Sequence, residues 1–217
     1  MRHFMASKRF SIAASVAFLT AALLTFYVRF VRPWHLHWGA TDAEVQMPLP
    51  GDELIPDARL VATRALTIRA PASAIWPWLV QMGYRRAGWY SYDWLDNDGS
   101  HVDRIIPELQ ALKVGDTLLT SPTGGFRVAA LEPERALVLL IRESAEGQRS
   151  AISSAMVLQP LDEQHTRLLI RVRAKFTGVR GRLFGLLFDF GDFVMMRKML
   201  LGIRHRVQAS VVHQLPL

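Results

Sequence analysis

The clearest hydrophobic pattern lies near the carboxyl end of the chain. Between residues 167 and 176 apolar and basic side chains alternate, and Leu169 alone breaks the alternation. A period of two predicts a β-strand with one buried face and one basic face. Further on the period becomes helical, with an apolar stripe over Phe193, Met196, Leu200, Ile203 and Val207. A long helix is therefore expected to end the fold.

The central part of the chain predicts further strands and a few short helices. Residues 60–70 are rich in β-branched side chains and predict a strand that Pro71 ends, followed by a helix capped by Ser73 and closed by Gly83. Another short helix is expected within residues 105–112. Turn-bounded apolar runs predict strands at residues 117–120, 126–131, 137–142 and 151–159. This order is typical of an α+β domain whose sheet wraps around a helix.

The amino-terminal segment has the composition of a membrane span. Residues 11–28 carry no charge and are just long enough to cross a bilayer as a helix, which Pro33 is expected to end. A cleaved secretory signal and a buried soluble helix are the alternatives, although residues 26–32 lack a small-side-chain cleavage site. Basic residues are almost balanced across the span and slightly favour a folded domain on the extracytoplasmic side.

These patterns give three regions. Residues 1–32 form the expected single-pass membrane anchor, residues 33–59 a linker or arm, and residues 60–217 the folded domain. The proline-rich arm also contains a possible helix start, with Thr41 as the cap and Glu44 three residues later.

Composition narrows the classes of function. The 217 residues include no cysteine, which excludes a disulfide scaffold, a thiolate metal site and a cysteine nucleophile. The net charge of +7 favours anionic surroundings, either phospholipid or nucleic acid. With a membrane span in the same chain we expect anionic lipid and no nucleic acid. The expected contact is the basic strand face, although such a row is also typical of a solvated surface; it comprises Arg167, Arg171, Arg173 and Lys175.

Four large aromatic side chains, at positions 89, 90, 92 and 94, lie within six residues. Each buries a large apolar area and keeps one polar group, which suits the wall of an apolar cavity or a plug in the core. If the sheet and the last helix enclose a cavity, its expected ligand-binding residues are Trp89, Tyr90, Tyr92, Trp94, Phe126, Met156, Phe193, Met196, Met199 and Leu200.

Polar residues beside these rings are the candidates for chemistry. A carboxylate pressed against indole rings would have a raised pKa and could act as a general acid or base. The candidates are Asp93, Asp96, Asp98, His101 and Asp103, and a reaction would use Asp93 with Tyr90 or Tyr92. Turn and capping roles explain the same residues. Neither a metal nor a cofactor is expected, because the histidines are scattered and Gly124-Gly125 lacks the rest of a phosphate loop.

Several segments resemble a known superfamily. The strand ending at Ala70-Pro71, the helix Ile75-Trp76-Pro77-Trp78-Leu79 and the closing helix resemble the START-like superfamily, also called SRPBCC or helix-grip proteins, which includes polyketide cyclases and lipid-transfer domains. The likeness covers about residues 60–210. Residues 38–42, 88–97 and 197–203 are similar to a bacterial subgroup with an amino-terminal membrane span.

The resemblance implies a helix-grip fold, in which a curved antiparallel sheet wraps around a long C-terminal helix and an apolar cavity lies between them. It implies no particular reaction. We therefore expect a membrane-anchored binding domain for a hydrophobic small molecule or lipid, a carrier or sensor, with no reaction assigned. A cyclase- or hydrolase-type enzyme using the same cavity and a structural envelope protein with a filled core are the alternatives.

Overall fold

A computed structural model describes residues 15–145 and 148–212, and the chain divides into two units, Met1–Leu36 and His37–Leu217. In the first unit one helix, Ser15–Leu36, is long and apolar enough to cross a membrane by length and composition. It includes a π-helical turn, η1 (Tyr27–Val31), followed by α2 (Arg32–Leu36). The prediction that Pro33 ends the helix is wrong. Pro33 is the second residue of α2 and directly follows the π-helical turn, where the Arg32 N–H donates to the Tyr27 carbonyl, so the wider turn accommodates a residue that has no N–H to donate.

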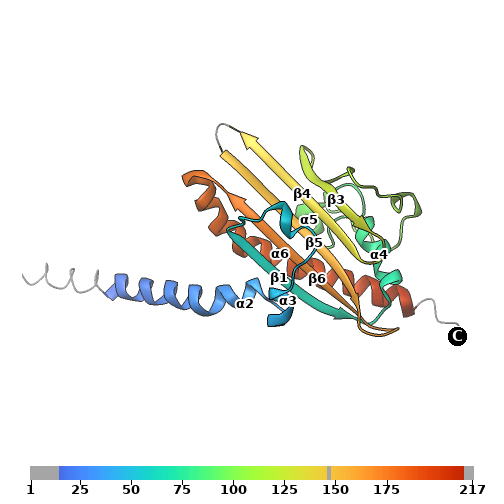
Figure 1. Ribbon diagram of the computed structural model, residues 1–217, viewed down its shortest axis with the longest axis horizontal. Helices are drawn as coiled ribbons and strands as arrows, with labels where there is room; N and C mark the ends of the chain where they lie inside the picture. Colours follow the sequence, from blue (N-terminus) through green and yellow to red (C-terminus); the bar gives the residue numbers. More distant parts are fainter. Residues whose placement is uncertain (1–14, 146–147, 213–217) are drawn as a thin grey trace, which may run out of the picture. The chain divides into compact units, whose positions relative to one another are not determined.

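The second unit is built on a curved six-stranded antiparallel sheet with the strand order β1-β6-β5-β4-β3-β2 (Figure 1). Every strand that the sequence predicts is present, and most are longer than predicted because pairing continues beyond the alternating core of each run. The strands are β1 (Leu60–Ile68), β2 (Thr117–Ser121), β3 (Gly124–Glu132), β4 (Ala136–Ala145), β5 (Gln148–Pro160) and β6 (Thr166–Phe176).

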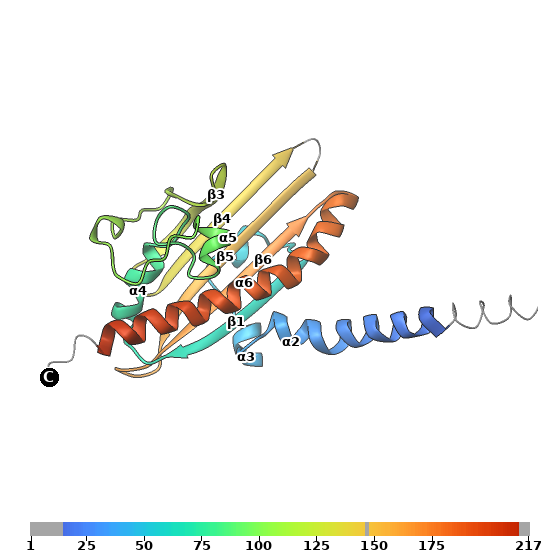
Figure 2. The same cartoon turned by 180° about the vertical axis from the view of Figure 1, so that it is seen from behind.

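A single long helix, α6 (Gly178–Val212), lies along one face of this sheet (Figure 2). It begins fifteen residues before the apolar stripe that predicted it. The early glycines do not interrupt it, because they allow the helix to pack closely on the last residue of β6. A Cβ atom at Gly185 would lie 3.1 Å from the Phe176 ring, and one at Gly181 would lie 3.3 Å from the Phe176 Cβ. The predicted helix-grip fold is confirmed.

The short helices differ from their predictions in detail. The capping box of α3 (Asp42–Gln46) is confirmed, since the Thr41 N–H donates to Glu44 at 2.7 Å and the Glu44 N–H donates to Thr41 at 3.2 Å. The helix α4 (Ala72–Val80) begins before Ser73 because Pro71 occupies its N-cap position, so the predicted Ser73 cap is wrong. The others are η2 (Asp52–Leu54), α5 (Asp93–Asp96) and η3 (Pro107–Leu109), the last a single 3₁₀ turn within the predicted region.

Residues 37–59 pack on the face of the sheet opposite α6. Leu49 of this arm lies in a buried cluster with Ala65, Val157 and Leu169, and Met47 packs against the same cluster. Leu169 is fully buried, which explains why it breaks the alternation of β6. Both faces of β1 and β6 are therefore covered, one by the helix and the other by the arm.

The basic residues of β6 hold the arm in place. Arg171, only 3% exposed, donates to the carbonyl oxygens of Glu44, Val45 and Met47 at 2.8–2.9 Å and to Asp52 at 2.7 Å. Arg167 donates to Glu44 at 2.7 Å and holds the pKa of that carboxyl at about 2.

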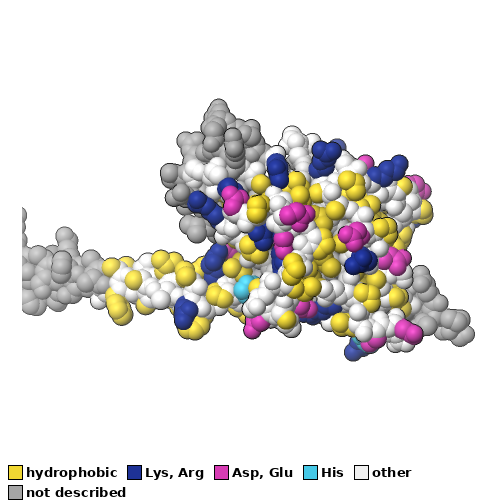
Figure 3. All heavy atoms as spheres, in the orientation of Figure 1, with side chains coloured by type: hydrophobic (Ala, Val, Ile, Leu, Met, Phe, Trp, Pro, Cys, Tyr) yellow, Lys and Arg dark blue, Asp and Glu magenta, His cyan; other side chains and the backbone are white. Residues whose placement is uncertain are grey.

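The other two cations of the row also meet the arm. Arg173 donates to the Ile55 carbonyl at 3.1 Å, and Lys175 pairs with Asp57. The four basic residues that the sequence predicts to contact lipid phosphates thus form hydrogen bonds or ion pairs with the arm. Figure 3 shows acidic and basic side chains interspersed on this side of the second unit.

Replacing Arg171 should release the arm. Arg171→Met removes one hydrogen-bond donor from Asp52 and one from each of three arm carbonyl groups, so we expect the free energy of unfolding to fall by about 3 kcal/mol. Urea unfolding of the full-length chain in detergent, followed by tryptophan fluorescence, measures this. The control is Arg135→Met, since Arg135 is exposed and its ion pair with Glu132 spans 3.7 Å. Equal effects of the two substitutions would contradict the role assigned to Arg171.

Candidate ligand cavity

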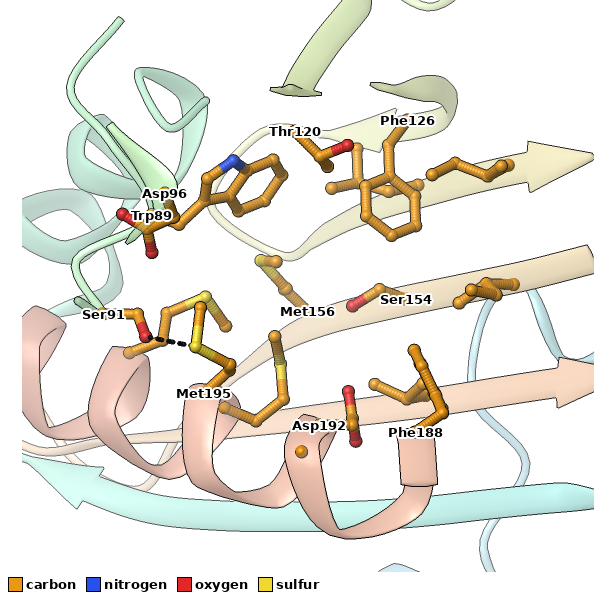
Figure 4. A pocket seen from close by; sticks show the side chains of 17 residues that line it. Trp89, Ser91, Asp96, Thr120, Phe126, Ser154, Met156, Phe188, Asp192 and Met195 are labelled. Atoms are coloured by element: carbon orange, nitrogen blue, oxygen red, sulfur yellow. Dashed lines mark hydrogen bonds between the residues drawn. The ribbon is translucent and has the colours of Figure 1, made fainter. Parts of the chain in front are cut away.

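A cavity of about 400 Å³ lies between the sheet and α6 (Figure 4). Most of the 17 side chains that line it are aliphatic, aromatic or methionine, and five carry a hydroxyl or carboxyl group. The lining consists of Trp89, Ser91, Asp96, Thr120, Phe126, Leu139, Ile141, Ile152, Ser154, Met156, Val172, Phe188, Gly191, Asp192, Met195, Met196 and Met199.

The strand side of the cavity follows from the register of the sheet. Leu139 of β4, Ser154 of β5 and Val172 of β6 are paired neighbours across three strands. Since side chains alternate along a strand, Ile152 and Met156 lie on the same face as Ser154. The register therefore places one polar side chain in the middle of an apolar floor.

The helix side of the cavity is a stripe of α6 at helical spacing, formed by Phe188, Asp192, Met195, Met196 and Met199. Four methionines line the cavity, three of them on this helix. The unbranched thioether side chain of methionine adapts to ligands of different shape. Gly191 lies on the same stripe, and a Cβ atom there would meet no other atom within 4 Å.

The loop before α5 closes one end of the cavity. The Trp89 indole N–H donates to the Leu119 carbonyl at 3.1 Å, and its ring packs edge-on against Phe126 at 5.9 Å. Tyr90 has a left-handed backbone with φ of 57°, which turns its side chain away from the cavity into the core. Ser91 then faces the cavity again.

Five of the ten residues expected to bind the ligand line the cavity: Trp89, Phe126, Met156, Met196 and Met199. The other five do not. Tyr90 and Leu200 are buried in the core, and Phe193 is turned towards Arg64, which lies 5.6 Å above its ring. Tyr92 stacks edge-on with Trp94, and Trp94 is 74% exposed.

The set expected to carry a reaction is not assembled in the cavity. The Tyr90 hydroxyl donates to the Trp78 carbonyl at 3.0 Å and accepts from Gln81 at 2.9 Å, and burial raises the pKa of this phenol. The Asp93 carboxylate lies 2.6 Å from the His101 ring nitrogen. Neither residue lines the cavity, and neither do Asp98 and Asp103.

Three of the five polar groups in the cavity already have partners. Asp192 accepts from Arg64 of β1 at 2.6 Å, and burial raises the pKa of Asp192 while Arg64 opposes that shift. The Ser91 hydroxyl donates to the Met195 sulfur at 3.4 Å, and the Thr120 hydroxyl donates to the Gly124 carbonyl at 3.2 Å.

The remaining two polar groups are Asp96 of α5 and Ser154 of β5. Both carboxyl oxygens of Asp96 and the hydroxyl of Ser154 are buried without a hydrogen-bond partner. Burial, reinforced by the charge of Asp93, raises the pKa of Asp96 to about 6. Of the acidic candidates from the sequence, Asp96 is the one that lines the cavity.

Some of the lining could have been found from the sequence. Met156 on a strand implies Ile152 and Ser154 on the same face, and Met196 on a helix implies Asp192 one turn earlier. Nothing local indicates Leu139, which reaches the cavity through its pairing with Ser154, or Thr120, which lies at the register shift between β2 and β3. Among the described residues, no group of three or more His, Asp or Glu side chains is arranged to hold a metal ion.

This fold and cavity define the second unit as a helix-grip domain, the class that the START-like resemblance implies. Comparison with family models and with curated proteins finds no match. The chain is similar in structure to a protein from Mycobacterium smegmatis, with 15% identity, a TM-score of 0.44, and 70% of this chain and 92% of that chain covered.

Two further similar structures carry descriptive names. One is a polyketide-cyclase-like protein from Corynebacterium glutamicum, with 15% identity, a TM-score of 0.34, and 71% of this chain and 94% of that one covered. The other is an aromatase/cyclase from a Streptomyces species, with 11% identity, a TM-score of 0.33, and 70% and 94% covered. These likenesses are distant, and the helix-grip assignment rests on the topology of the sheet and α6.

Removing the Asp96 carboxyl should change how stability depends on pH. Its folded pKa of about 6 lies above the ordinary 3.8, so the unfolded chain releases this proton first and stability falls as pH rises between those values. Relative to the wild type, Asp96→Asn should gain about 1–2 kcal/mol between about pH 4 and pH 7, after allowance for solvent screening. Urea unfolding across that range measures the gain, and a pH-independent difference would contradict the raised pKa.

Proposed function

We propose that the helix-grip unit binds a hydrophobic small molecule in the cavity between its sheet and α6, as a carrier or sensor tethered to a membrane by the helix Ser15–Leu36. The observation that carries the proposal is the cavity itself. Its volume of about 400 Å³ falls within the range of small-molecule sites, which are typically apolar with a few polar groups.

The chemistry of the lining supports a binding role. A core filled by its own side chains would not leave a space lined by Phe126, Phe188 and Met156. Among the described lining residues, the Asp96 carboxyl and the Ser154 hydroxyl have no hydrogen-bond partner. A few separate polar groups in an apolar lining are typical of sites that fix the orientation of a ligand. A tether to the bilayer would shorten the path of an apolar molecule into the cavity.

Filling the cavity should weaken binding without unfolding the protein. Gly191 lines the cavity and a Cβ atom there would meet no other atom within 4 Å, so a leucine would add bulk at the cavity wall, and it should favour the helix by about 1 kcal/mol. The probe is undecanol with a terminal bromine atom, which quenches an indole that it contacts. For the full-length chain in lipid nanodiscs, we expect Gly191→Leu to bind this probe with an affinity roughly tenfold or more below that of the wild type.

Two comparisons make this measurement specific. Trp89→Phe keeps a ring in the cavity wall but removes its indole, so the quenching lost in that variant reports the cavity and not partition into lipid. Lys198→Leu adds a leucine at an exposed position of the same helix and should leave binding unchanged. If undecanol never quenches Trp89, or quenches it equally in Gly191→Leu, the proposed function is wrong.

The side of the membrane can be tested because the chain has no cysteine. Glu163 is exposed in the turn between β5 and β6, so Glu163→Cys supplies one reactive thiol on the folded unit. An extracytoplasmic domain predicts labelling of intact cells by a membrane-impermeant maleimide. Labelling only after the cells are lysed would place the domain in the cytoplasm.

An enzyme that uses the same cavity is the second candidate, favoured by one observation. A buried carboxyl whose pKa is raised to about 6 is poised for general acid–base catalysis. The candidate for that role is Asp96, because Asp93 is paired with His101 and does not line the cavity. Conversion of a bound ligand by the wild type but not by Asp96→Asn would favour this alternative.

A further inference from the structure

The charge balance of the cavity is uneven. Among the described residues that line it there is no Lys, Arg or His, whereas there are two carboxyl groups. The Asp192 carboxylate forms an ion pair with Arg64, with 2.6 Å between the donor and acceptor atoms. Asp96 is only 6% exposed, and among the described residues neither of its carboxyl oxygens has a hydrogen-bond partner and no cation pairs with it.

A buried carboxylate without a hydrogen-bond donor is costly, and folded proteins rarely retain one. Its pKa of about 6 means that Asp96 is mostly ionised at neutral pH, so the cost is present under physiological conditions. The neighbouring Asp93 cannot relieve it, because Asp93 is also acidic and faces His101. A cationic donor in the cavity would relieve it.

We infer that Asp96 holds the polar end of the ligand and that the cavity selects hydrophobic amines over carboxylates of the same shape. This inference rests on the proposed function and specifies its ligand class. Figure 4 shows Asp96 beside Trp89 on the loop side of the cavity and Ser154 on the strand floor. The apolar part of the ligand would lie along the methionines of α6 and the rings of Trp89 and Phe126.

The three simplest polar ends differ in how they meet Asp96. A protonated amine offers three donors and a positive charge to the carboxylate. A hydroxyl group offers one donor and no charge. A carboxylate offers no donor at neutral pH, and it would have to be desolvated beside two other acidic groups with no lining cation to receive it. The expected order of affinity is therefore amine, then alcohol, then carboxylate.

Three probes that share one hydrophobic chain test this order. They are undecylamine, undecanol and undecanoate, each with a terminal bromine atom, added to the full-length protein in nanodiscs of uncharged lipid. Binding is read as the quenching that Trp89→Phe abolishes, so partition of each probe into the lipid is subtracted. A hydrogen bond between charged groups predicts that the amine binds roughly tenfold or more tightly than the alcohol.

Two substitutions assign the preference to one carboxyl group. In Asp96→Asn the affinity for the amine should fall about tenfold, to that for the alcohol, while the affinity for the alcohol changes little. The control Asp103→Asn makes the same chemical change at an exposed residue of the same region and should leave all three affinities unchanged.

The outcomes separate this inference from the proposed function. Undecanoate binding as tightly as undecylamine, or an amine preference that survives in Asp96→Asn, would overturn the inference and leave a hydrophobic cavity in place. If none of the three probes quenches Trp89, the proposed function fails and the inference fails with it. The expected order in the wild type, lost in Asp96→Asn alone, would support both.

Discussion

The ion pair between Arg64 and Asp192 fixes the relation between the two layers of the folded unit. Arg64 extends from β1 and is almost fully buried, and Asp192 lies on the stripe of α6 that faces the sheet. Burying two charges costs free energy that their attraction recovers only with close geometry, here 2.6 Å between the donor and acceptor atoms. This pair favours one rotation of α6, and in that rotation Phe188, Met195 and Met199 line the cavity.

The sheet can carry such a residue because β1 and β6 are covered on both faces. Thr63 and Arg64 are neighbours on β1, yet both are buried, one bonded to Arg171 on the arm side and the other to Asp192 on the helix side. Local sequence patterns predicted the strands and the existence of the closing helix correctly, because each element has its own pattern of apolar residues, although the helix begins well before its stripe. The packing of the arm was not predictable from any local period, since Leu49 meets Leu169 across 120 positions of the chain. Leu169 was the only local sign of it.

The same distinction applies to the cavity. Trp89, Phe126 and Met196 reach it as the local pattern suggested, because their elements are oriented by their own hydrophobic faces. Tyr90 does not, because its left-handed backbone reverses the direction of the side chain, and that conformation cannot be inferred from aromatic density. Whether an acidic residue has a partner is also a tertiary property. Asp93 and Asp96 lie one helical turn apart in a single sequence motif, but only Asp93 has an ionisable partner, supplied by a loop residue eight positions away.

Asp96 and Asp192 therefore show two ways in which one fold treats a buried carboxyl. The Asp192 carboxylate is paired with Arg64 from the opposite layer, so its charge is compensated within the protein. Asp96 has no such cation, so the folded state bears its desolvation cost whenever it is ionised. Residues that break a rule of folding without compensation tend to mark functional sites, because the missing interaction is supplied from outside. In a cavity lined mostly by methionine, aromatic and aliphatic side chains, a molecule that is apolar along its length and cationic at one end would supply the missing interaction.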